Sequence, residues 1–166
     1  LENAEFVRFG MIHRNTYING PDVLRDTWQM KTRDDLFFAG QISGVEGYVE
    51  SAASGLMAGR NAAALVLGRP LRVLPRTTAL GALAHYVSHA NPRHYQPTNI
   101  TFGIMEPIDD RSSPRMRAPD GRKMSRKETR KFALSERALT DLERWMDAPF
   151  DTLRARFDSL RAGGEE

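Results

Sequence analysis

A glycine-rich segment, Gly40–Gly47, is the part of this sequence best suited to hold a ligand. It stands between a short apolar run, Leu36–Ala39, and a long alanine-rich stretch. A turn between a buried strand and a helix directs free backbone N–H groups and the positive end of the helix dipole at its ligand. An anionic or electron-accepting group is favoured there, such as a pyrophosphate or the N1 and C2 carbonyl region of a flavin. Alternatively the glycines only let the helix pack closely, and their spacing does not decide between the two.

A polar run near the start of the chain is a second candidate site. His13, Arg14, Asn15 and Tyr17 bring donors and acceptors together at a density unusual for a connecting segment. The guanidinium of Arg14 is suited to bind a phosphate or a carboxylate with two parallel hydrogen bonds. The alternative is a solvated loop, in which His13 is a structural hydrogen-bonding residue rather than a general base.

The positive charge is concentrated in one block. Residues 111–131 hold nine basic residues and only two acidic ones, whereas residues 1–110 are nearly balanced. Such a block is either a solvated face or a surface that neutralises RNA phosphates. Hydroxyl side chains accompany it and aromatics are almost absent, which favours gripping of the backbone over base stacking. The candidate RNA-binding residues are Arg111, Arg115, Arg117, Arg122, Lys123, Arg126, Lys127, Arg130 and Lys131.

Other chemistries are excluded or not supported. With no cysteine, the chain has no thiol nucleophile and no disulfide of its own, and a reducing, cytoplasmic location is expected. The histidines His85, His89 and His94 lack the partners of a metal site, so no metal is predicted. No apolar run approaches the roughly 18 residues of a membrane span. The chain begins without a methionine or a signal sequence, so we expect a missing N-terminal part.

The elements around the glycine-rich segment predict an α/β fold. The apolar run 36–39 lacks a solvent-facing alternation, as expected for a strand of a parallel sheet buried on both faces. A helix is predicted over 48–67, ending at Gly68 and Pro70. Its apolar positions recur at roughly helical spacing: Ala52, Ala53, Leu56, Met57, Ala63 and Val66. Its small residues would let the helix press closely against a sheet or another helix: Ser51, Ala52, Ser54, Gly55, Ala58 and Gly59.

The rest of the chain is predicted to be mainly helical. Thr77 or Thr78 caps one helix, and a capping box at Ser125–Glu128 begins another that ends near Met146. Residues 93–120 are irregular, and a last short helix uses Phe150, Leu153, Phe157 and Leu160. Three parts follow: residues 1–75, the C-terminal portion of a Rossmann-like domain; residues 76–110, a helix and an irregular segment; and residues 111–166, a basic segment with helices.

Residues 36–56, LFFAGQISGVEGYVESAASGL, resemble the second FAD motif of the folate-dependent tRNA (uracil-5-)-methyltransferases. A related motif occurs in the glucose-inhibited division protein A flavoproteins, which modify tRNA uridines with a carboxymethylaminomethyl group. Three further stretches favour the methyltransferases: FVRFGMIHRNTY at 6–17, TALGAL at 78–83 and QPTNITFG at 96–103. The resemblance covers roughly residues 5–146.

The resemblance implies the C-terminal part of a Rossmann-like FAD-binding domain in a tRNA methyltransferase. The family transfers a carbon from 5,10-methylenetetrahydrofolate to C5 of a uridine in the tRNA T loop, with FAD as cofactor and NAD(P)H as reductant. The polar run at residues 13–17 would then bind substrate. The residues that would lie near FAD are Gly40, Gln41, Gly44, Val45, Glu46, Gly47 and Tyr48.

The family uses cysteines that this chain lacks, so no catalytic residue is assigned and the chain alone is expected to be inactive. Two alternatives stay open. One is a carboxymethylaminomethyl-modifying flavoprotein. The other is a non-catalytic RNA-binding piece in which the glycine-rich turn is structural.

Overall fold

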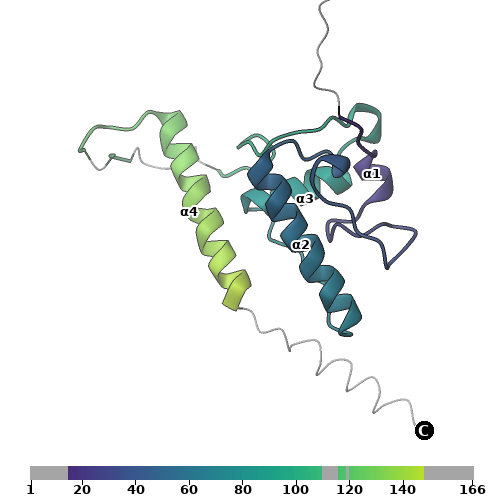
Figure 1. Ribbon diagram of the computed structural model, residues 1–166. Helices are drawn as coiled ribbons and strands as arrows, with labels where there is room; N and C mark the ends of the chain where they lie inside the picture. The colour runs from purple at the N-terminus through teal and green to yellow at the C-terminus, as the bar shows by residue number, and fades with distance from the viewer. Residues whose placement is uncertain (1–14, 110–115, 119, 148–166) are drawn as a thin grey trace, which may run out of the picture.

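A computed structural model describes residues 15–109, 116–118 and 120–147 of the chain. Three helices pack together and a fourth lies to one side of them (Figure 1). The helices are α1 (Gly20–Val23), α2 (Tyr48–Val66), α3 (Ala79–His89) and α4 (Arg126–Asp147), with short 3-10 turns at Gly40–Ser43 and Pro92–His94. The predicted helices over 48–67, after Thr78 and after Ser125 are all confirmed.

The predicted buried strand at 36–39 is not found. The segment is extended and half-buried, and its one ladder contact is an antiparallel bridge between Phe37 and Gln29. Phe38 N–H donates to Trp28 O at 3.0 Å, and Met30 N–H donates to Leu36 O at 2.8 Å. Phe37, Phe38 and Ala39 therefore pack against the helical core rather than inside a sheet. Only isolated bridges, and no longer strand, occur among the described residues.

Helix α2 begins at Tyr48, after the N-cap residue Gly47, and ends where the sequence predicts. Gly68, one residue past the C-cap, takes the left-handed conformation (φ 62°) that only glycine adopts without cost. The buried face consists of Ser54, Met57, Ala58, Asn61 and Ala64. It includes two of the predicted small residues, Ser54 and Ala58, but only Met57 of the predicted apolar positions. The predicted Leu56 and Val66 are 66% and 86% exposed.

Asn61 decides which face of α2 turns inward. It is 2% exposed, and its amide donates to Thr27 O at 3.1 Å and to Arg72 O at 3.0 Å. Its Oδ1 accepts from Arg72 N–H at 2.9 Å. A buried amide with all these bonds is tolerated in a core and ties three segments together, whereas an unpaired one would be costly.

Helix α3 forms the centre of the core. Thr78 caps it, since its Oγ1 accepts from Gly81 N–H at 3.1 Å. Leu83 and Val87 are at most 1% exposed and pack with Leu24 and Trp28. The backbone of α1 approaches α3 closely.

Helix α4 carries the predicted capping box at its start. Ser125 N–H donates to the Glu128 carboxylate at 2.8 Å, and Glu128 N–H donates to Ser125 Oγ at 3.2 Å. At its other end the Trp145 indole N–H donates to Val73 O at 2.8 Å, and the ring lies 4.0 Å from the Arg72 guanidinium. The capping box therefore stabilises the first turn of α4, and Trp145 ties its last turn to the segment before α3.

Candidate functional site

The glycine-rich turn forms a compact loop in front of α2. Gly40 and Gly44 have positive φ angles of 69° and 86°, which favour glycine. The turn is bonded to α2 behind it: Gly40 N–H donates to Ser54 Oγ at 2.9 Å, and Ser51 Oγ donates to Val45 O at 3.1 Å. These two serines set the position of the turn relative to the helix axis.

A segment some fifty residues downstream holds the other side of the turn. Thr98 N–H donates to Gly44 O at 3.0 Å, and Glu46 N–H donates to Thr98 O at 3.1 Å, forming the parallel bridge between Val45 and Thr98. The QPTNITFG stretch therefore lies directly against the turn, which its sequence alone did not indicate.

Tyr95 is a buried support of the turn. It is 5% exposed, and its hydroxyl donates to Ser43 O at 2.6 Å. A Cβ atom at Gly44 would lie 2.1 Å from the Tyr95 hydroxyl oxygen, so only glycine admits this approach. Burial raises the pKa of the Tyr95 phenol well above its usual value, which keeps the hydroxyl protonated as a donor.

The end of the polar run at residues 13–17 lies against the glycine-rich turn and Tyr95. Ile18 N–H donates to Ile42 O at 2.9 Å, and the Tyr17 ring stands edge-on to Tyr95 with centroids 6.1 Å apart. Asn15 and Tyr17 are exposed beside the turn. The other two predicted substrate-binding residues, His13 and Arg14, lie outside the described residues.

The predicted cofactor-binding residues divide into exposed and buried groups. Gln41, Glu46 and Tyr48 are exposed, with Tyr48 at 91%. Val45 is fully buried, and both its backbone groups are already bonded, its N–H to Gly40 O. Gly44 is covered by Tyr95. Any ligand therefore meets the turn mainly through the exposed side chains of Gln41, Glu46 and Tyr48.

The start of α2 suits an electron-rich group. A helix of 19 residues directs its dipole at Gly47, and no side chain caps this end. Glu50 folds back over Gly47, where an added Cβ would lie 1.9 Å from the carboxylate, and its Oε1 accepts from Ile100 N–H at 3.4 Å. Glu50 is thereby a structural link between α2 and the downstream segment.

A basic face covers the first turns of α4 and the hairpin before it. All seven described members of the predicted RNA-binding set are exposed: Arg117, Arg122, Lys123, Arg126, Lys127, Arg130 and Lys131. Arg111 and Arg115 lie outside the described residues. An antiparallel bridge between Arg117 and Lys123 closes the hairpin, and Arg122 pairs with Glu128 at 3.1 Å. The Arg122 hydrogen bond lowers the pKa of the Glu128 carboxyl to about 2.

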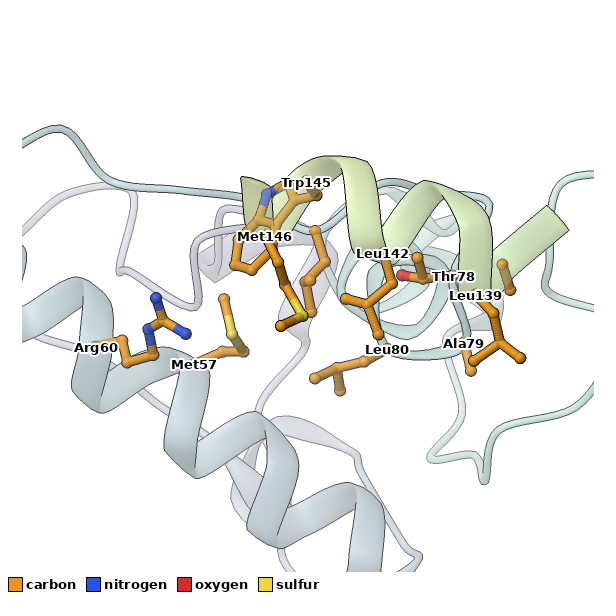
Figure 2. Close-up of a pocket in the computed structure, with 11 residues that line it drawn as sticks. Met57, Arg60, Thr78, Ala79, Leu80, Leu139, Leu142, Trp145 and Met146 are labelled. Carbon is orange, nitrogen blue, oxygen red and sulfur yellow. The ribbon is translucent and has the colours of Figure 1, made fainter. Parts of the chain in front are cut away.

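An apolar groove separates α4 from α2 and α3. Figure 2 shows Met57 and Arg60 on one side and Trp145 and Met146 on the other, facing a cavity of about 400 Å³. Its lining has little hydrogen-bonding capacity, so it offers no reacting group. Within the part of the chain that the structure describes, no three His, Asp or Glu side chains are placed to hold a metal, and no helix is long and apolar enough to cross a membrane.

The chain is similar to known tRNA-modifying enzymes. A family model described as glucose inhibited division protein A matches residues 1–70. The curated relatives named methylenetetrahydrofolate--tRNA-(uracil-5-)-methyltransferase TrmFO include one from Anoxybacillus flavithermus, 61% identical over 110 residues (66% of this chain, 26% of the relative). Those from Streptococcus uberis and Streptococcus sanguinis are 47% and 51% identical over 148 and 147 residues (89% of this chain, 31% of each relative).

The predicted resemblance to the folate-dependent tRNA (uracil-5-)-methyltransferases is therefore confirmed. The chain spans about a third or less of the length of the curated relatives it matches.

Proposed function

We propose that this chain contributes one wall of the flavin site, and an RNA-binding face, to an FAD- and folate-dependent enzyme that methylates C5 of a tRNA uridine. The observation that carries the proposal is the turn Gly40–Gly47 at the start of α2. Its two positive-φ glycines and its uncapped helix end lie in a segment that the comparisons cover. The names of the relatives supply the substrate class and the reaction.

The residues present fit a flavin at this end of α2. Gln41 and Tyr48 are exposed at the turn and offer an amide and an aromatic ring to a ligand. The helix dipole favours the negative charge that accumulates near N1 and the C2 carbonyl of a reduced flavin. When bound, FAD supplies the electron transfer in the delivery of the folate-derived carbon.

Folate and the target nucleotide would meet the turn from two sides. Asn15 and Tyr17 are exposed next to Ile42 and offer an amide and an aromatic ring to a pterin. Addition of a nucleophile to the pyrimidine is needed to activate C5, and a thiol for this step must come from outside these 166 residues because they contain no cysteine.

The test uses the complete open reading frame that encodes this chain. The purified protein is expected to show the visible absorption of oxidised flavin, and to methylate a tRNA transcript when given 5,10-methylenetetrahydrofolate and NAD(P)H. A colourless protein that cannot be reconstituted with FAD would refute the proposal.

A matched pair of glycine variants tests the role of the turn. Gly40→Ala and Gly68→Ala place the same strain on the backbone, since φ is 69° and 62°. Gly40 belongs to the turn, whereas Gly68 follows the far end of α2 and has open space around it. Gly40→Ala is expected to release FAD and Gly68→Ala to retain it; equal retention would remove the turn from the flavin site.

The match to the glucose inhibited division protein A model favours a second candidate, a flavoprotein that installs another group on a tRNA uridine. Mass analysis of the nucleosides from treated tRNA distinguishes the two. A product that carries one added methyl group supports the methyltransferase, and a larger adduct supports the alternative.

A further inference from the structure

The fold places an exposed aromatic side chain at the edge of the basic face. Phe102 belongs to the QPTNITFG stretch and is 42% exposed. The ammonium of Lys131, on α4, lies 5.4 Å from the centre of its ring. The sequence of the basic block contains almost no aromatic residue, so this neighbour comes only from the tertiary structure.

Phe102 also lines a cavity of about 330 Å³ between the segment 100–105 and α4, next to the start of α3. This volume lies within the roughly 300–1,000 Å³ range of small-molecule sites. Ile100 and Leu139 form apolar walls, and Thr101 and Ser135 bring hydroxyl groups to the lining. The Ser135 hydroxyl donates to Lys131 O at 3.1 Å, which leaves its oxygen able to accept a further hydrogen bond.

The cavity lies along the path between the basic face and the glycine-rich turn. Ile100 lines it and donates its N–H to Glu50, in the first turn of α2, and Thr98 pairs with the turn itself. On the other side, Ser135 follows Lys131 by one turn of α4. The cavity therefore adjoins both the basic face and the segment that holds the turn.

We propose that this cavity, the Phe102 pocket, receives an unpaired nucleobase of the bound RNA. The base stacks on the Phe102 ring, and an imino or amino N–H of its edge donates to Ser135 Oγ. The adjacent phosphate lies near Lys131 and Lys127. Positive charge beside an aromatic-lined cavity suits a polyanion whose bases can leave the helical stack. The proposal rests on RNA being the partner of the basic face.

The test compares two exposed phenylalanines of similar environment. Phe102→Leu removes the stacking surface of the pocket. Phe132→Leu is the matched control, because Phe132 is 44% exposed, stands beside Lys131 in the sequence and does not line the pocket. Affinity of the chain is measured for an unstructured uridine-rich oligonucleotide and for an RNA duplex of equal length, over a range of salt concentrations. Circular dichroism and thermal unfolding verify that both variants fold.

Phe102→Leu is expected to weaken single-strand binding about tenfold, with little effect on the duplex and with an unchanged salt dependence, because stacking contributes without releasing counterions. Phe132→Leu is expected to stay within about twofold of the parent. Equal effects of the two substitutions on affinity, or an equal loss of affinity for duplex and single strand, would refute the proposal that the Phe102 pocket binds a nucleobase.

A third variant separates this inference from the proposed function. Lys127→Gln should weaken both RNAs and reduce the salt slope by about one unit. If Lys127→Gln weakens binding of both RNAs and Phe102→Leu has no effect, the RNA-binding role of the basic face is supported and the base-binding role of the Phe102 pocket is refuted. If the chain binds neither RNA, or the charge variant leaves the salt slope unchanged, the RNA-binding role itself is refuted, and the pocket with it.

Discussion

The contact between Gly44 and Tyr95 predicts that two neighbouring glycines respond very differently to the same substitution. Gly40→Ala places a Cβ atom 3.6 Å from Ser51 Cβ, an ordinary contact, whereas Gly44→Ala places one 2.1 Å from the Tyr95 hydroxyl oxygen. Both carry the cost of a non-glycine residue in the left-handed region, about 1–2 kcal/mol. Gly44→Ala must in addition displace Tyr95.

The size of the additional cost follows from what Tyr95 holds. Its displacement breaks the 2.6 Å bond to Ser43 O and leaves a buried carbonyl unpaired. An unpaired buried polar group costs about 1–3 kcal/mol. Gly44→Ala is therefore expected to lower the free energy of unfolding by about 2–5 kcal/mol, and Gly40→Ala by about 1–2 kcal/mol.

Urea denaturation of the chain, followed by circular dichroism, measures both values. A double-mutant cycle with Tyr95→Phe gives the direct test, because removing the hydroxyl relieves the closest contact and should make Gly44→Ala less costly by about 1 kcal/mol. If the two alanine substitutions cost the same, or if Tyr95→Phe does not change the cost at Gly44, then Tyr95 does not support the turn as described.

Three further predictions concern the framework. Asn61→Ala should destabilise the chain by about 2–4 kcal/mol in denaturant, because it removes three hydrogen bonds that the buried amide makes with Thr27 O and with the N–H and O of Arg72; a cost below about 0.5 kcal/mol, as for an ordinary surface substitution, would contradict this. Trp145→Phe loses the bond to a backbone carbonyl, so the last turns of α4 should exchange amide hydrogens faster, with those of α2 unchanged. The Glu128 pKa falls from its ordinary 4.5 to about 2. Its stabilisation of α4 is therefore present above pH 4.5 and lost as the pH falls toward 2; helical circular dichroism should follow this, and Glu128→Gln should remove the dependence.

The helices were predictable because their signals are local. The Ser125 and Glu128 pair, the Thr78 cap and Gly68 each act within one turn of the helix end that they mark. The buried face of α2 was not predictable from hydrophobicity. A polar side chain, Asn61, faces inward because its partners come from other segments, and Leu56 faces outward.

The conformation of residues 36–39 and the supports of the turn were also not predictable, because both depend on partners far away in the sequence. A buried apolar run such as 36–39 has the composition of a sheet strand, but its conformation depends on which segments are available to pair with it. The turn was visible through its glycines. Its supports, Tyr95 and Thr98, were not, because a lone tyrosine or threonine in an irregular segment carries no signal of what it touches. The position of Phe102 beside Lys131 was not predictable from the sequence either.

The pairing of Gly44 with Thr98 has a consequence for how the protein is made. The turn is synthesised before the residues that fix its far side, because Tyr95 and Thr98 follow only after α3 is complete. Until those residues emerge, the turn lacks their bonds but keeps its contacts with Ser51, Ser54 and Ile18. Its final shape is therefore acquired late, when the downstream segment leaves the ribosome and docks, so a chain interrupted before residue 95 would carry the whole glycine-rich motif without the geometry that the motif adopts here.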